Sequence, residues 1–177
     1  SLLNEPGGWQ DQIYSAYGGL LDIRFLDNRY EVSRVMMSQD ALRVFEDNAF
    51  LIVTQRVHSK ARLADAVISL QQGTTYIEQF KGLYDPLLNA LHTGSVGRVA
   101  EILKEASTIK QKFTATHSND TKSISEILDY HRIAHKVCGS GSGGAIFCLA
   151  PYKVQTEIAI EVGEKLNRAI RIIPVKI

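Results

Sequence analysis

Two stretches of the sequence gather residues that could bind or activate a small molecule. The first is the run GGWQDQ at residues 7–12, which is followed by Tyr17 and by glycines at 18 and 19. If a helix begins at Asp11, its carboxylate lies at the positive end of the helix dipole, where it could orient a substrate hydroxyl or accept its proton. The simpler interpretation is that Asp11 only caps the helix.

The second stretch is a glycine-rich turn that follows Lys136 between two apolar segments. It consists of Gly139, Ser140, Gly141, Ser142, Gly143 and Gly144. Backbone amides in such a turn can form a nest for an anion, and glycine lets a phosphate approach closely. It is not a Walker phosphate loop, because no Gly-Lys-Ser or Gly-Lys-Thr follows it. A glycine-rich hairpin that binds nothing is the other interpretation.

Short strands and one short helix are predicted in the first third of the chain. Residues 20–26 and 30–36 alternate as strands do, and the Asp27-Asn28 pair between them is typical of a hairpin turn. Ser38 is a suitable N-cap for a helix over residues 39–46. The continuous apolar run at 49–54 is typical of a buried central strand.

The remaining two thirds contain mostly helices, followed by a return to strands. The predicted elements are helices at 61–70, 76–91, 96–113 and 124–130, strands at 135–138 and 145–149, a helix at 152–166 and a strand at 169–177. From residue 49 onward this order is that of a split βαβ, or ferredoxin-like, fold with extra helices in its first crossover. The predicted fold class is therefore α+β, with a helix and a β-hairpin in residues 1–48 and a ferredoxin-like domain in residues 49–177.

Composition argues against several kinds of partner. The 177 residues include 20 Lys and Arg against 19 Asp and Glu, so binding to nucleic acid or to a membrane surface is not expected. No apolar run approaches the roughly 20 residues that a membrane-spanning helix needs. Cys138 and Cys148 fit neither a CxxC redox pair nor a zinc site, and the histidines lack metal-ligand spacing. These features predict free thiols in a cytoplasmic protein without a bound metal.

Residues 7–19 and the glycine-rich turn after Lys136 together resemble motifs of the GHMP kinases. Within that family they look most like the heptose-phosphate kinases and the fucokinases. Residues 8–12 with Tyr17-Gly18-Gly19 look like the segment around that family's catalytic aspartate, and residues 136–144 look like its third motif. The resemblance spans nearly the whole chain and implies a GHMP-type C-terminal domain of ferredoxin-like fold. It implies that residues 1–48 lie at the boundary with an N-terminal domain.

The resemblance also implies roles for individual residues. Asp11 becomes the catalytic base, Trp9, Gln10 and Tyr17 become sugar contacts, and the loop 139–144 lies beside the transferred phosphate. The complete enzyme would use ATP and Mg²⁺, and its other substrate would be a sugar or a sugar phosphate.

Two departures from the family pattern stand out. The family's phosphate-binding loop and its first motif do not occur in this sequence. We therefore expect that an N-terminal kinase domain is missing and that this chain alone does not bind ATP tightly. After the strand at 49–54 the relatives continue with Thr-Gly and then an arginine, whereas here Gln55 follows Thr54. No substrate role is therefore assigned to Arg56, His58 or Arg62.

Three functions are compatible with these features. The leading hypothesis is an ATP-dependent sugar or sugar-phosphate kinase in which Asp11 prepares a hydroxyl for in-line attack on phosphorus. The alternative is a non-catalytic ferredoxin-like module that binds or senses a ligand. A third possibility is a related isomerase or decarboxylase of the same superfamily.

Overall fold

The computed structural model describes residues 10–27, 29–54, 74–113, 118–138 and 144–177. The chain begins with helix α1 (Gln10–Tyr17) and continues into strands β1 (Leu21–Leu26) and β2 (Arg29–Arg34), which pair antiparallel from Leu21 opposite Arg34 to Leu26 opposite Arg29. The predicted hairpin is therefore confirmed. Helix α2 (Gln39–Asn48) follows, and the Ser38 side chain caps it by accepting a hydrogen bond from the Ala41 amide at 3.2 Å.

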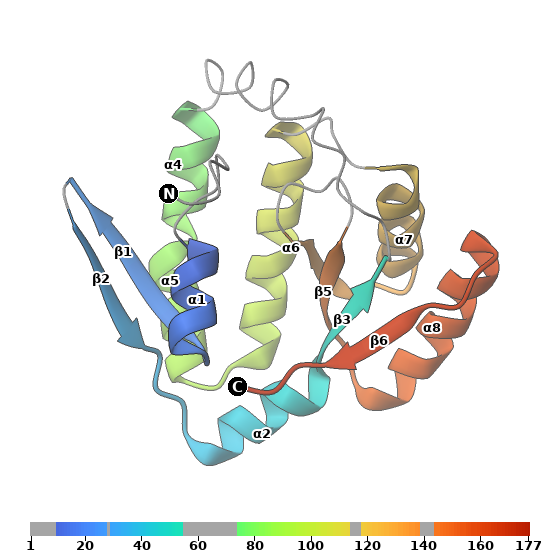
Figure 1. Cartoon of the computed structure of the whole chain (residues 1–177), viewed down its shortest axis with the longest axis horizontal. Coiled ribbons are helices and arrows are strands. Elements are labelled where there is room, and N and C mark those ends of the chain that lie inside the picture. Colours follow the sequence, from blue (N-terminus) through green and yellow to red (C-terminus); the bar gives the residue numbers. More distant parts are fainter. Residues whose placement is uncertain (1–9, 28, 55–73, 114–117, 139–143) are drawn as a thin grey trace.

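A four-stranded sheet forms the centre of the molecule. Its strands are β3 (Ala49–Val53), β4 (Ala134–Val137), β5 (Ala145–Leu149) and β6 (Arg171–Pro174), in the order β4-β5-β3-β6 with every neighbouring pair antiparallel. The predicted α+β class with an antiparallel sheet is confirmed. Figure 1 shows β3 running through the middle of the sheet, with helices on both of its faces.

Two of the predicted helix boundaries are wrong. The single helix expected at 76–91 is divided into α4 (Thr74–Gly82) and α5 (Tyr84–His92). Pro86 explains the division, because its ring nitrogen has no N–H to donate and it clashes with the carbonyl four residues earlier, which belongs to Gly82. Helix α7 (Asn119–Tyr130) begins five residues earlier than expected, since the Ser118 side chain accepts from the Thr121 amide at 3.2 Å.

Two further long helices complete the fold. Helix α6 (Val96–Phe113) and helix α8 (Tyr152–Leu166) match their predicted bounds, and α8 ends at Asn167 in a left-handed conformation. The helix predicted at 61–70 lies outside the described residues. Among the residues that are described, no helix is both long enough and apolar enough to cross a bilayer.

The sheet is buried on both faces because alternate side chains of its central strands face opposite layers. On one face, Phe50 and Ile52 of β3 and Ile146 of β5 pack against α7 and α8. On the other face, Ala49 and Leu149 pack against residues of α2, α5 and α6. Cys148 is buried in the first of these cores and is a free thiol, as is Cys138, and burial raises the pKa of the Cys148 thiol.

Candidate functional site

Asp11 lies in the first turn of α1. The helix begins at Gln10, so Asp11 is its second residue and the capping position precedes both of them. The structure describes the backbone of Gln10 and Asp11 but not their side chains, and Trp9 lies outside the described residues. The helix places the peptide N–H groups of its first turn beside Asp11, so a carboxylate there is in a positive local potential.

The end of α1 is fixed by a left-handed turn and by an arginine. Gly18 and Gly19 have φ angles of +59° and +75°, a conformation that favours glycine, and they reverse the chain into β1. Arg34 of β2 donates from Nη2 to the Tyr17 carbonyl at 3.0 Å. The Tyr17 side chain, a predicted sugar contact, is 52% exposed. The Arg34 hydrogen bond thus holds the C-terminal end of α1, and the ring of the predicted site residue Tyr17 is accessible to solvent.

The glycine-rich loop connects β4 to β5, as predicted, and its far end is held by Thr54. Residues 139–143 lie outside the described part, whereas Gly144 is described and has a φ of +100°. The Thr54 hydroxyl accepts from the Gly144 amide at 2.9 Å and lies 3.1 Å from the Gly144 carbonyl, to which the Thr54 amide also donates at 2.8 Å. Thr54 is only 1% exposed, whereas its partner Gly144 is partly exposed.

Arg168 connects Thr54 to the helices α7 and α8. Its Nη2 atom donates to the Thr54 carbonyl at 2.8 Å and to Asp120 Oδ2 at 2.8 Å. Asp120 belongs to the first turn of α7, and Arg168 follows the end of α8. We call Thr54, Arg168 and Asp120 the loop anchor, because together they join the end of β3, the start of α7 and the end of α8 at the point where the glycine-rich loop ends.

The near end of the loop is held by a lysine. Lys110 of α6 donates from Nζ to the carbonyl of Val137, the last residue of β4, at 2.9 Å. Burial, together with the neighbouring charge of Lys136, lowers the pKa of Lys110 to about 8. Lys110 therefore remains mainly protonated at neutral pH. Two lysine side chains at the base of a glycine-rich loop favour an anionic ligand there.

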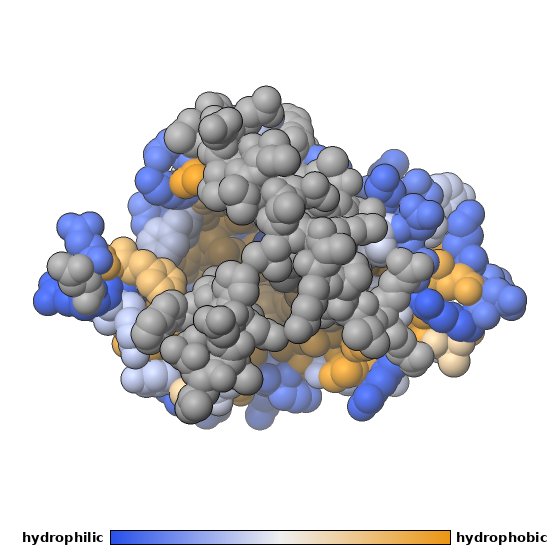
Figure 2. All heavy atoms as spheres, turned by 45° about the horizontal axis from the view of Figure 1, so that its top comes forward, coloured by the Kyte–Doolittle hydropathy of each residue, from blue (hydrophilic) through white to orange (hydrophobic). Residues whose placement is uncertain are grey.

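The two predicted parts of the site face the same side of the molecule. In Figure 1 the first turn of α1, the end of β3 and the start of β5, which pairs with the end of β3, are all directed toward the top of the view. Figure 2 turns this side forward and shows hydrophilic residues gathered at its two extremes, the β1–β2 hairpin and the α7–α8 pair. The described residues bring the two parts onto one face but establish no direct contact between them.

Replacing Thr54 by valine tests the loop anchor. Valine keeps the size of the side chain but removes the hydroxyl, which leaves the partly buried Gly144 amide without its acceptor. We expect the free energy of unfolding to fall by about 1 kcal/mol, the usual net contribution of one hydrogen bond. Chemical denaturation measures this, and Thr54→Ser, which restores the hydroxyl, should recover most of the loss. A valine variant as stable as the wild type would show that the bonds to Gly144 contribute nothing.

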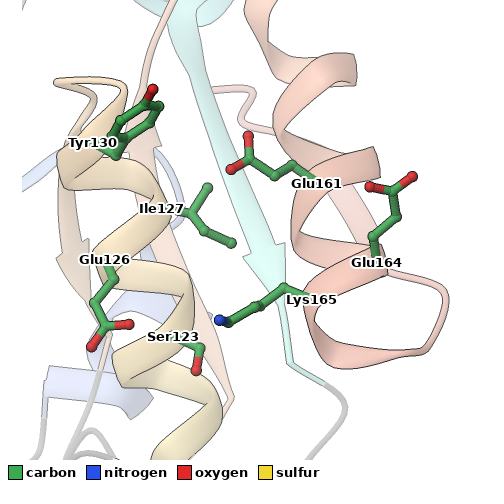
Figure 3. A pocket seen from close by; sticks show the side chains of 7 residues that line it. All are labelled: Ser123, Glu126, Ile127, Tyr130, Glu161, Glu164 and Lys165. Atoms are coloured by element: carbon green, nitrogen blue, oxygen red, sulfur yellow. The ribbon is translucent and has the colours of Figure 1, made fainter.

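A groove lies between α7 and α8, on the face of the sheet opposite to α5 and α6. It has a volume of about 470 Å³, and Figure 3 shows Glu126 on one wall, Glu161 and Glu164 on the other, and Ile127 between them. His131 bonds Glu161 at 2.6 Å. Three carboxylates against the single Lys165 make this groove unsuited to the phosphates of a nucleotide. This groove is therefore not a candidate for binding a phosphate.

A metal centre made only of protein ligands is not found in the described ranges. They contain no group of three or more His, Cys, Asp or Glu side chains placed to hold an ion.

Sequence reasoning missed the residues that hold the loop. The sequence patterns place Thr54 at the end of a strand and predict no role for Arg168, Asp120 or Lys110. Thr54 and Gly144 are 90 residues apart, and Thr54 and Arg168 are 114 apart. No local pattern signals such pairings. The one available clue was the Thr that ends the apolar run at 49–54, since a hydroxyl there is unusual in an otherwise apolar strand.

Comparison with known proteins shows which folds this chain resembles. No protein-family model matches the chain. The bifunctional fucokinase/GDP-fucose pyrophosphorylase of Arabidopsis thaliana is 26% identical over 178 residues, which cover 94% of this chain and 16% of that protein. A D-glycero-D-manno-heptose 1-phosphate kinase from Bacteroides thetaiotaomicron has a similar structure, with a TM-score of 0.63, 22% identity, and coverage of 98% of this chain and 47% of that one.

A galactokinase from Lactococcus lactis, solved with galactose, is also similar. Its TM-score is 0.69 at 13% identity, and the match covers 99% of this chain and 55% of that one. The predicted resemblance to the C-terminal portion of the GHMP kinases is confirmed, and at these identities the structural likeness shows the fold. The chain spans about half the length of the solved kinases and about a sixth of the plant protein.

Proposed function

We propose that this chain is the C-terminal part of an ATP-dependent kinase that phosphorylates a hydroxyl of a sugar or a sugar phosphate. The observation that carries the proposal is the likeness of 98% of the chain to a heptose-phosphate kinase. The placement of Asp11 in a first helical turn, on the side of the molecule where the glycine-rich loop begins and ends, supports it.

Each part of the site has a defined task in this proposal. Asp11 accepts the proton of the sugar hydroxyl as the hydroxyl oxygen attacks the γ-phosphorus of ATP, and the bond from that phosphorus to the bridging oxygen breaks to release ADP. The glycine-rich loop, with Lys110 and Lys136 at its base, stabilises the negative charge on the transferred group. Mg²⁺ would neutralise charge on the phosphates when bound.

Sugar recognition is assigned to the residues around Asp11. Trp9 and Tyr17 offer aromatic rings, and Gln10 offers an amide that can both donate and accept hydrogen bonds. Tyr17 is the member of this group whose side chain is described, and its exposure leaves it available to a ligand. The rest of the sugar site would come from the N-terminal kinase domain that we propose precedes this chain.

We further propose that the β4-β5-β3-β6 sheet is the ferredoxin-like arrangement. Helices connect β3 to β4 and β5 to β6, and a hairpin connects β4 to β5, which are the connections of a split βαβ fold. Residues 49–177 would form this domain and residues 1–48 the segment between domains. The free thiols Cys138 and Cys148 fit a reducing compartment such as the cytoplasm.

The proposed function is tested by an ADP-release assay with ATP, Mg²⁺ and a panel of monosaccharides and monosaccharide phosphates. The assay should be run on this chain alone and on the chain combined with its N-terminal kinase domain. We expect activity in the combined protein with at least one sugar and loss of that activity in the Asp11 variant discussed below. A combined protein that binds sugars but never releases ADP would favour the binding-module alternative.

A prediction about ATP follows from the sequence motifs that this chain contains. We expect the 177-residue chain alone to bind ATP no more tightly than about millimolar, because the amides at a helix N-terminus that usually grip nucleotide phosphates are not among its motifs. Isothermal titration calorimetry measures the Kd directly. Micromolar binding would show that the chain carries a complete nucleotide site.

A further inference from the structure

The β1–β2 hairpin is a two-stranded sheet that stands apart from the central sheet. Within the described residues its strands pair only with each other, and Figure 1 shows the hairpin projecting at the side of the molecule, away from the four-stranded sheet. A hairpin of two strands is at best marginally stable in water unless one of its faces packs on something. What each face contacts therefore bears on how this hairpin is held in place.

The two faces of the hairpin differ in character. Alternate residues of a strand point to opposite faces, so the strand register decides which side chains lie together. One face carries four apolar residues, which are Ile23 and Phe25 of β1 and, opposite them, Val32 and Tyr30 of β2. Four charged residues lie on the other face, namely Asp22, Arg24, Arg29 and Glu31. This division is typical of a sheet that buries its apolar face.

It is nevertheless the charged face that contacts helix α5. Arg24 Nε donates to the Tyr84 hydroxyl at 3.1 Å, and the Arg24 guanidinium lies 5.6 Å from the centre of the Tyr84 ring. The Asp22 side chain beside Arg24 is 7% exposed. The apolar face is buried at its base, where Leu21 is 6% exposed, whereas Phe25 near the tip is 58% exposed. Toward its tip the apolar face is therefore open to solvent.

Helix α1 extends this apolar surface toward Asp11. Tyr14 follows Asp11 by three residues, so the two positions are neighbours on one face of α1, and the Tyr14 side chain is 46% exposed. Tyr14, Ile23 and Phe25 line one groove together with apolar residues of α5. We call the surface made by these side chains and their cross-strand partners the hairpin face, which consists of Tyr14, Ile23, Phe25, Tyr30 and Val32.

The composition of the hairpin face is that of a protein interface. Six of the 13 large apolar side chains that are exposed among the described residues lie between positions 14 and 36, so they are concentrated here. Protein interfaces commonly have aromatic residues at their centre and charged residues at their rim. Tyr14, Phe25 and Tyr30 supply such a centre. Arg29 and Glu31, which lie 3.6 Å apart, supply part of a rim.

The comparisons favour one occupant for this surface, the half of a kinase that this chain does not span. The match covers 47% of the heptose-phosphate kinase and 55% of the galactokinase, so each contains about as much chain again. In the proposed function, an N-terminal domain completes the sugar site around Asp11. A domain that lies against the Asp11 end of α1 also reaches Tyr14, and from there the hairpin face continues without interruption.

We propose that the hairpin face docks the N-terminal kinase domain through an apolar surface of that domain, with Tyr14, Phe25 and Tyr30 at the centre of the interface. The inference rests on the proposed function for the identity of the partner. It gives the hairpin, which neither sequence motif includes, the task of holding that domain beside Asp11.

The experiment is hydroxyl-radical footprinting, read by mass spectrometry, on the 177-residue chain alone and on the combined protein of the kinase assay. Oxidation of Tyr14, Phe25 and Tyr30 should slow by about 3-fold or more in the combined protein, because docking excludes water from the centre of an interface. Tyr130 of α7 and Tyr152 of α8 are the controls, since they are 81% and 73% exposed and lie outside the hairpin face. They should be oxidised at the same rate in both proteins.

Phe25→Ser tests whether the aromatic centre holds the domain. Truncating a central aromatic residue weakens an interface by about 10- to 100-fold, so the oxidation of Tyr14 and Tyr30 in the combined protein should return toward its rate in the chain alone. Tyr152→Ser, which truncates an exposed ring on α8, should leave both rates unchanged. Tyr30→Ser is a second variant in case Phe25→Ser does not fold.

Three results would overturn the proposal. The first is unchanged oxidation of the hairpin face in the combined protein, and the second is equal protection of Tyr130 and Tyr152. The third is a dimer of the chain alone, seen by sedimentation velocity, that already protects the hairpin face, because a second copy would then be the occupant. The measurement needs neither ATP nor turnover. Protection in an inactive combined protein would therefore contradict the kinase proposal alone, whereas phosphoryl transfer without protection would contradict only the docking.

Discussion

Replacing Asp11 by asparagine should lower kcat for phosphoryl transfer by about 10²- to 10⁴-fold in the combined enzyme, the usual contribution of a general base. Asparagine keeps the size of the side chain and most of its hydrogen bonds but cannot take the hydroxyl proton. The KM for the sugar should change much less, because the lost interaction acts mainly in the transition state. Steady-state kinetics with saturating ATP measures both quantities.

The chain offers a closely matched control for this variant. Helix α2 begins with Gln39-Asp40, just as α1 begins with Gln10-Asp11, so Asp40 is also the second residue of its helix. Asp40→Asn removes the same charge from the same position in a helix dipole and should cost about 0.3–1 kcal/mol of stability without changing kcat. If Asp11→Asn behaves like Asp40→Asn, with an altered melting temperature and an unaltered kcat, Asp11 only stabilises its helix and has no catalytic role.

Replacing Gly94 by alanine should destabilise the fold by about 2–5 kcal/mol. Gly94 has a φ of +67°, which costs an alanine about 1–2 kcal/mol, and a Cβ built there would lie 2.4 Å from the Ala41 Cβ. The overlap forces α2 away from the turn between α5 and α6, and such overpacking typically adds about 1–3 kcal/mol. Urea denaturation measures the change in the free energy of unfolding.

Gly97 provides the comparison for Gly94. It lies three residues later, in the first turn of α6, and a Cβ at this position would meet nothing within 4 Å. Gly97→Ala should therefore be neutral or should stabilise the helix by up to about 1 kcal/mol. Equal effects of the two substitutions would mean that the close approach of Gly94 to Ala41 does not exist in solution.

The sequence predicted the elements whose signals are local. The apolar run at 49–54, the alternation on either side of Asp27-Asn28 and the stripe of α8 each identified an element of the right type in the right place. The division between α4 and α5 also has a local signal, since Pro86 removes a hydrogen bond from the helix ladder, but helical periodicity alone predicts one helix. The early start of α7 has its signal in Ser118, whose side chain caps the helix.

The candidate site was predictable only where it is made of contiguous motifs. The stretch around Asp11 and the loop after Lys136 stand out by residue type. Thr54 and Arg168 did not, because a threonine at the end of an apolar run and an arginine after a helix carry no local sign that they meet. Their hydrogen bond spans 114 positions of the chain, which periodicity cannot reveal.

The loop anchor also has a consequence for the order in which the protein folds. Its contacts join residues 114 and 48 positions apart, and closing long segments of chain carries an entropic cost that must be met before the contacts form. The β4–β5 hairpin and the individual helices can form from contacts close in sequence, whereas Thr54, Arg168 and Asp120 meet only after both crossovers have docked on the sheet. We therefore expect the far end of the glycine-rich loop to be fixed late in folding, only when the whole domain is assembled.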